Sequence, residues 1–450
     1  MLALRLTRGS HPAVQLRRLL VAVASAGTGF LLLCTLGYAM GHPDSPAAAA
    51  LRLAWCATPL AATVYFAVAV ARTDPATKPR PGLSAIGLGP GRLMAISATT
   101  TALACTLGSM LALLFFLHLR GDLTGMPFDG AAAEFLASGT PLPLPAALTL
   151  LAVVPVTASV SVALTLRPKD TSPKSAPRSY GRFGAYGRSG TRETFGTYGR
   201  FGAHLRTGGR KAEIEETPAP APEPAADAEP TATVTGPVDL DPTRPPAPRE
   251  VPKGLPWGVA VLAAGLAVEA YANRTADTDG LSMPGGHAGG PAGVLAGWVL
   301  TALGLAFAGP GLTHLCGRLL QAVRPGALRL LAGRVLMEEA TRIGRPLGVV
   351  CAVASGAYAM TALYDTDAAV GPLTTLGTLL VAGCTVATLL TAAVEARQAR
   401  ADTTAALVRL GAPATVLRSA AALRAGALLA LFVPLTVVIA ELAALPLAHR

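Results

Sequence analysis

The sequence predicts an all-α membrane protein whose chain crosses the bilayer about nine times. Hydrophobic residues make up 52% of the 450 residues and charged residues only 14%, whereas soluble domains carry about 25% charged residues. A helix needs roughly 20 residues to cross the hydrocarbon core, and nine apolar segments meet that length. The alternating pattern of a β-barrel is absent. We expect the spans near 19–40, 51–71, 93–117, 143–166, 255–272, 291–311, 346–364, 373–394 and 425–447.

Matches 324 positions apart indicate a duplicated unit. The tetrapeptide Ala-Leu-Arg-Leu at 3–6 recurs at 327–330, and the segment 83–87 aligns with 407–411 without a gap. The apolar spans and the loops between them fall in step at the same offset, so we expect spans 7, 8 and 9 to repeat spans 1, 2 and 3. The expected regions are a first repeat at 1–166, a linker at 167–254, a central hairpin of spans 5 and 6 at 255–311, and a second repeat at 312–450.

The second repeat lacks an equivalent of the fourth span, because that span would map beyond residue 450. Two arrangements remain open. Either the bundle is asymmetric with nine spans, or the segment 404–447 bends at Pro434 into more than one embedded piece. A homodimer could supply the missing helix.

The positive charges predict the orientation of the chain. Lys and Arg that flank spans stay on the cytoplasmic side, and an N-terminus inside leaves all but four of the 37 Lys and Arg on inner segments. The four on the outer side are Arg52, Arg120, Arg274 and Arg450. The C-terminus then lies outside. The net charge of +11 is therefore explained by this bias and by attraction to anionic inner-leaflet lipids, without a nucleic-acid partner.

The linker differs in composition from the rest of the chain. Its front half is basic and repeats the hexapeptide Tyr-Gly-Arg-Phe-Gly-Ala at 180–185 and 198–203, while its rear half is acidic and rich in Pro and Ala. Such a segment buries too little apolar surface to offset its chain entropy, so we expect disorder. Arg interleaved with Tyr and Phe can bind RNA, but a flexible tether along the inner leaflet is the favoured interpretation.

The sequence shows no catalytic, cofactor or metal motif. It contains no P-loop of the form G-x-x-x-x-G-K-[ST], and its seven histidines show no HExxH or paired-ligand spacing. The six cysteines lie in or beside apolar spans without a CxxC pair, so we expect small core residues. The chain is therefore predicted not to be an enzyme, and to need no cofactor.

Few charged residues fall within the spans. Glu269 and Glu441 lie near the outer ends of spans 5 and 9, and Glu395 lies at the inner end of span 8. Their side chains are expected to reach water, with a substrate or proton site as the less favoured alternative. Arg424 at the base of span 9 is expected to anchor the inner face. In span 6, Gly293 and Gly297 form a GxxxG pair that can seat a neighbouring helix closely.

A cytoplasmic segment between spans 8 and 9 has the features of a mechanical lever. Over 395–413, Leu407 and Leu410 share one helical face, and the cations on the segment reach water. Gly411 is expected to stop the helix, with Pro413 just beyond it.

This segment resembles the coupling segment of FtsX-like (MacB-type) ABC transporter permeases, in which a basic cluster is followed by Leu-x-x-Leu-Gly-Ala and then a span. The basic stretch 329–345 before span 7 also resembles the pre-membrane helix of that family, and two repeats with a helix pair between them match a family plan. The resemblance covers most of the chain apart from the linker. The large external domain typical of many members is missing.

The resemblance implies a permease subunit of a bacterial plasma membrane that docks a separate cytosolic ATPase and exports or extracts a substrate. The implied docking residues of the second copy are Arg397, Arg400, Asp402, Leu407, Arg409, Leu410 and Gly411. Those of the first copy are Leu83, Ile86 and Gly87, in a segment whose prolines at 75, 79 and 81 disfavour a helix. The alternatives are a non-transporting scaffold or signalling adaptor that recruits a cytosolic partner through the linker and, less favoured for lack of central charges, a secondary carrier.

Overall fold

The computed structural model describes residues 12–74, 89–123, 130–167, 254–275, 292–322, 326–363 and 371–448. These residues are helical apart from turns and short links, with no strand among them, and all belong to one compact unit built from Met1–Lys169 and Arg249–Arg450. The predicted all-α class is confirmed. The expected disordered linker lies outside the described residues, apart from its first and last positions.

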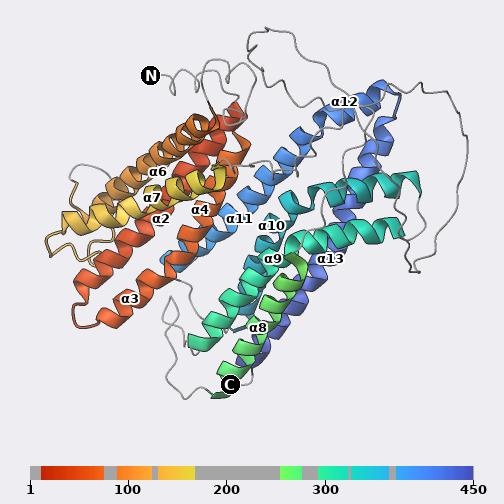
Figure 1. Cartoon of the computed structure of the whole chain (residues 1–450). Helices are drawn as coiled ribbons and strands as arrows, with labels where there is room; N and C mark the ends of the chain where they lie inside the picture. The colour runs from red at the N-terminus through yellow and green to blue at the C-terminus, as the bar shows by residue number, and fades with distance from the viewer. Residues whose placement is uncertain are drawn as a thin grey trace, which may run out of the picture. The chain divides into compact units, whose positions relative to one another are not determined.

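Figure 1 shows the helices in the order of the chain. In order they are α2 (Pro12–Gly41), α3 (Pro46–Trp55), α4 (Ala57–Thr73), α6 (Pro90–Arg120), α7 (Leu144–Leu166), α8 (Gly254–Thr275), α9 (Ala292–Ala322), α10 (Ala327–Leu363), α11 (Pro372–Ala399), α12 (Ala401–Arg409) and α13 (Ala414–Ala448). Within the described part of the chain, nine helical segments are long and apolar enough to cross a membrane, with α3 and α4 together forming one of them. The chain is thus a multi-pass membrane protein, as predicted.

The second span is one apolar segment, Pro46–Thr73, as predicted, although its helix is interrupted at one residue. Cys56, between α3 and α4, keeps φ −66° and ψ −14°, and its N–H donates to the carbonyl of Arg52 at 3.3 Å. Pro59 explains the break, since its ring nitrogen has no hydrogen to donate to the carbonyl of Trp55 one turn earlier. The hydropathy pattern does not reveal such a break because both pieces are apolar.

The last span is a single helix. After the short α12, α13 runs from Ala414 to Ala448 and continues through Pro434. The alternative of several embedded pieces is therefore wrong for the described residues. Likewise, α10 starts at Ala327, so the basic stretch before span 7 and the span itself form one helix, which passes through Pro346.

One core lies among α2, α4, α6, α7 and α11. The side chains of Val21, Phe66, Cys105 and Ala158 are buried together there, and Cys384 joins them from α11. α11 packs mainly on α4 and also contacts α10, so it connects this core with the helices that follow the linker (Figure 1). All six cysteines are free and buried, which confirms the prediction that they are core residues.

A second set of helices, α8, α9, α10 and α13, packs with very close backbones. A Cβ placed on Gly265 of α8 would lie 2.9 Å from the carbonyl oxygen of Gly297 on α9. A Cβ on Gly317 of α9 would lie 2.8 Å from the carbonyl oxygen of Gly333 on α10. Glycine at these positions lets the backbones approach, as in small-residue interfaces of membrane helices. The expected close packing at Gly297 is confirmed.

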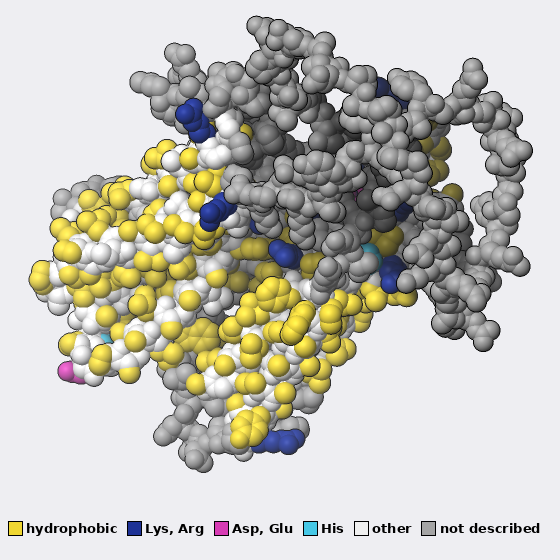
Figure 2. Space-filling view, viewed as in Figure 1, with side chains coloured by type: hydrophobic (Ala, Val, Ile, Leu, Met, Phe, Trp, Pro, Cys, Tyr) yellow, Lys and Arg dark blue, Asp and Glu magenta, His cyan; other side chains and the backbone are white. Residues whose placement is uncertain are grey.

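The outer surface of the helices is apolar. Leu103, Leu107, Leu111 and Leu114 form a stripe along α6 and are each at least 55% exposed. Figure 2 shows hydrophobic side chains over much of the visible surface of the described helices. A soluble protein rarely exposes so large a contiguous apolar area, so lipid is the solvent that this surface fits.

Candidate functional site

The candidate site is the segment from the end of α11 to the start of α13. Arg400 is the single residue between α11 and α12. α12 ends in a Schellman turn: the N–H of Ala412 donates to the carbonyl of Leu407 at 3.0 Å, and the N–H of Gly411 donates to that of Val408 at 3.0 Å. Gly411 has φ +88°, a conformation that glycine adopts without strain. The predicted helix stop at Gly411 is therefore confirmed.

α12 lies on the surface, with no buried residue. Leu410 is 84% exposed and Val408 is 53% exposed, while Leu407 is half-buried. The polar residues of the expected docking set are exposed too, namely Arg397, Asp402 and Arg409. The structure thus presents this set on one short, accessible helix and the last turn of α11.

Arg400 is the exception, because its side chain turns back into the bundle. Its Nε lies 2.6 Å from Oε1 of Glu339 on α10 and donates to the carbonyl of Ala396 at 3.1 Å. On the other side of the carboxylate, Nη1 of Arg424 on α13 lies 3.9 Å from Oε2. We call Glu339, Arg400 and Arg424 the base cluster.

The base cluster is largely shielded from water. The Glu339 side chain is 8% exposed, that of Arg400 28% and that of Arg424 16%. The two guanidinium groups offset part of the cost of removing the Glu339 carboxylate from water, and removal of one partner from such a pair is strongly destabilising. The cluster therefore fixes the start of α12 to α10 and to α13. Arg424 does not serve only as the expected surface anchor.

Sequence reasoning missed Glu339. It lies in the basic stretch 329–345, in which the only acidic residues are Glu338 and Glu339. A carboxylate among so many cations is a signal of pairing, but its partner is 61 positions away on another helix. Arg400 is one of the expected docking residues, and in the structure its side chain pairs with Glu339.

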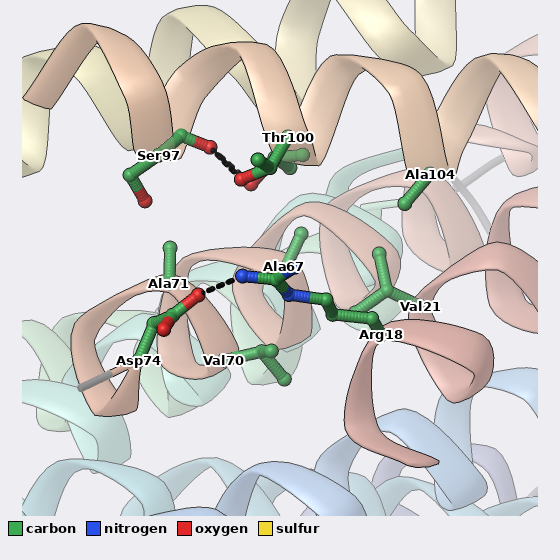
Figure 3. Close-up of a pocket in the computed structure, with 10 residues that line it drawn as sticks. Arg18, Val21, Ala67, Val70, Ala71, Asp74, Ser97, Thr100 and Ala104 are labelled. Atoms are coloured by element: carbon green, nitrogen blue, oxygen red, sulfur yellow. Dashed lines mark hydrogen bonds and ion pairs between the residues drawn. The ribbon is translucent and has the colours of Figure 1, made fainter. Parts of the chain in front are cut away.

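The first half of the chain has an ion pair in a similar place. Arg18, near the start of α2, pairs with Asp74, the residue that ends α4. Beside it, Nη1 of Arg17 donates to Oγ1 of Thr73 at 3.4 Å. Figure 3 shows the Arg18–Asp74 pair on one side of a small pocket and Ser97 and Thr100 of α6 on the other.

The docking residues expected in the first copy, Leu83, Ile86 and Gly87, lie outside the described residues. The structure describes the two helix ends that flank the segment with these residues: α4 ends at Thr73, and α6 begins at Pro90. The pocket of Figure 3 lies between the last two turns of α4, residues 97–104 of α6 and the first part of α2.

The two carboxylates near the outer boundary behave differently from one another. Glu441 is exposed, as expected, and its Oε1 accepts a hydrogen bond of 2.7 Å from the hydroxyl of Tyr358. Glu269 is 1% exposed and accepts a hydrogen bond of 3.1 Å from Thr301 of α9. The prediction that Glu269 reaches water is therefore wrong, because the glycines of α9 let α8 pack over it.

The candidate site combines an exposed helix with a charged cluster. In the described ranges, no group of three or more His, Cys, Asp or Glu side chains is placed to hold a metal ion. The site brings together exposed apolar and basic side chains on α12 and a charged cluster beneath it. It can bind a protein surface and pass displacement to the helices below.

A scan of protein-family models, a search of curated proteins and a search of solved structures each found no match to this chain.

Proposed function

We propose that the chain is the membrane subunit of an ABC-type transport system of the FtsX-like kind, and that a separate cytosolic ATPase docks on α12. Two features of α12 support the proposal. The helix is exposed, and Nε of Arg400, the residue just before it, lies 2.6 Å from the Glu339 carboxylate of α10. A surface that binds a partner is thereby connected to the spans.

The base cluster supplies the route for mechanical work. α12 continues from α11 through Arg400 and turns into α13 at Gly411. Glu339 adds a link to α10. A partner that displaces α12 must therefore move α11 and α13 together with α10, or break a shielded ion pair. This is the behaviour that a lever driven by nucleotide hydrolysis requires.

The chemistry of α12 defines the partner surface. Leu407 and Leu410 offer an apolar ridge, and Arg397 and Arg409 add positive charge near its two ends. A complementary surface has an apolar groove with acidic residues at its rim. The chain has no P-loop of its own, so ATP hydrolysis is assigned to the partner.

The packing of the helices supports a duplicated permease unit. α2 packs on both α4 and α6, and α10 packs on both α11 and α13, while the two second helices, α4 and α11, pack on each other. Each set also joins its first helix to the end of its second helix by an ion pair, Arg18–Asp74 in one and Glu339–Arg400 in the other, with the charges reversed.

The remaining features of the proposal follow from charge and loop length. The N-terminus and α12 lie in the cytoplasm, the C-terminus lies outside, and the basic segments contact anionic inner-leaflet lipids. Short external links favour a lipophilic or membrane-extracted substrate over a folded one. One chain carries both repeats, so a single copy or a homodimer can form the transport unit.

Co-purification in mild detergent tests the proposal. Wild type is compared with Leu407→Asp/Leu410→Asp and with the matched control Ala401→Asp/Ala405→Asp, which adds the same charge to exposed positions on the opposite face of α12. We expect a P-loop ATPase to co-purify with the wild type and the control but not with the Leu variant. Absence of an ATPase from the wild type, or its full retention by the Leu variant, contradicts the proposal.

The adaptor alternative predicts the opposite result for these variants. If the linker recruits the partner, then deletion of 180–250 abolishes co-purification while the Leu407→Asp/Leu410→Asp variant keeps it. If α12 is the docking segment, the deletion leaves the ATPase bound. The two variants measured together distinguish the two functions.

A further inference from the structure

A single carboxylate is enclosed between α8 and α9. Glu269 of α8 is 1% exposed, and it faces the glycine-lined side of α9. A Cβ on Gly297 would lie 2.9 Å from the backbone nitrogen of Glu269, so the missing side chain of Gly297 provides the space that the glutamate occupies. The carboxylate is therefore held at the helix contact rather than at the lipid surface.

The carboxylate has fewer partners than an ionised group requires. Oγ1 of Thr301 donates to Oε1 at 3.1 Å. Oε2 is buried and has no hydrogen-bond partner among the residues that the structure describes. An ionised carboxylate accepts at both oxygens, and a buried one without a compensating cation carries a large desolvation cost.

The described charged groups of the neighbouring helices do not compensate it. Arg274, later on α8, is exposed. The titratable groups of α9 are His314, Cys316 and Arg318, all more than three turns beyond Thr301. α13 also packs on α8 and α9; its titratable groups are Arg418, Arg424, which lies beside Glu339, and Glu441, which accepts from Tyr358. No described Lys, Arg or His forms an ion pair with Glu269.

We propose that Glu269 is a proton-binding site between α8 and α9, and that the bound proton stabilises the packing of the two helices. In its neutral form the carboxylic acid loses its formal charge, which removes most of the cost of burial in a membrane. Its carbonyl oxygen, Oε1, accepts from Thr301, and its hydroxyl is Oε2. The inference does not depend on the proposed docking of an ATPase.

The step is a simple acid dissociation. The O–H bond of the neutral acid breaks, the proton passes to water, and the carboxylate keeps the electron pair. Water must reach Oε2 for this to happen, and the close approach of α8 to α9 excludes it. Release of the proton and loosening of the helix contact are therefore linked, and no other reactant is required.

Carbodiimide labelling tests whether the proton is present. Dicyclohexylcarbodiimide adds to a protonated carboxylic acid in an apolar environment to give a stable acylurea, which peptide mass spectrometry locates. An exposed glutamate, with a pKa of about 4.3, is ionised at neutral pH. In membranes at neutral pH we expect labelling of Glu269 and not of the exposed Glu441.

Two variants sharpen the labelling result. Glu269→Gln removes the acid and keeps its shape, so the label should disappear, whereas Glu441→Gln should leave it unchanged. Labelling of Glu269 only at acidic pH, in step with Glu441, would show an ordinary glutamate and overturn the proposal. Equal labelling of both residues at neutral pH would overturn it as well.

Stability against pH tests the link to packing. The folded protein holds the proton, whereas the unfolded chain releases it above about pH 4.3, so wild type loses stability relative to Glu269→Gln as the pH rises from about 5 to about 8. Glu441→Gln alters an exposed carboxylate outside the site and serves as the control, with the same pH dependence as wild type. A difference in melting temperature between wild type and Glu269→Gln that stays constant over this range contradicts the proposal.

Discussion

Arg400 and Glu339 form an ion pair across two helices, with 2.6 Å between Nε and Oε1. Arg400 is the residue that joins α11 to α12, and Glu339 lies in the first half of α10. The pair therefore ties the most exposed helix of the described chain to the bundle at the point where that helix begins. A displacement of α12 must therefore also move α10 and α11 or break this ion pair.

The first prediction concerns the strength of this pair. Glu339→Gln and Arg400→Gln each leave a partly buried charge without its partner, so each should lower the free energy of unfolding. In a double-mutant cycle measured by detergent-induced unfolding, we expect a coupling energy of about 1 to 3 kcal/mol. Arg397→Gln on the exposed side of α11 is the matched control. A coupling energy near zero would show that the two side chains do not act together.

The second prediction concerns the turn after α12. Gly411→Ala places a Cβ at φ +88° and should cost about 1 to 2 kcal/mol, with loosening of the link between α12 and α13. Gly426→Ala in α13 is the control, because a Cβ there meets nothing within 4 Å. Thermal unfolding of the two variants checks this. Equal melting temperatures would refute the role given to Gly411.

The number of spans could be predicted from the sequence, whereas the interactions between them could not. Hydropathy is a local property, so each of the nine spanning segments in the described residues lies near its expected position. The break at Cys56 was missed because Pro59 interrupts a segment that is apolar on both sides. The Glu339–Arg400 pair was missed because each residue, taken alone, looks like an ordinary charged residue at the end of a membrane span.

Glu269 shows the same limit. Its position near the end of a span predicts a side chain that reaches water. Its burial depends on Gly265 and Gly297, which let α8 and α9 approach, and on Thr301, which supplies the hydrogen bond. The sequence contains these glycines, but it does not reveal which helix packs against them.

The third prediction concerns this glycine contact. Gly297→Ala adds a Cβ that would lie 2.9 Å from both the nitrogen of Glu269 and the carbonyl oxygen of Gly265. Overpacking of this kind should destabilise the protein by about 1 to 3 kcal/mol. Gly356→Ala in α10, where a Cβ meets nothing within 4 Å, should be neutral or slightly stabilising. If both variants unfold alike, the close packing of α8 and α9 is wrong.

The fourth prediction concerns the ion pair of the first half. Asp74 is 8% exposed and pairs with Arg18, so Asp74→Asn should leave a shielded guanidinium group short of a counter-charge and cost about 1 to 3 kcal/mol. Asp44→Asn at an exposed position is the control and should have little effect. Unfolding in mixed micelles gives both values. A loss of stability no greater than that of the control speaks against a structural role for the pair.

The side of the membrane on which α12 lies tests the account most directly. In intact cells we would treat an Ala405→Cys variant with a membrane-impermeant thiol reagent; the six native cysteines are buried, so the new thiol is the one that reports. We expect no labelling in intact cells and full labelling in inside-out vesicles. Labelling at position 405 in intact cells would place α12 outside, beyond the reach of any cytosolic ATPase.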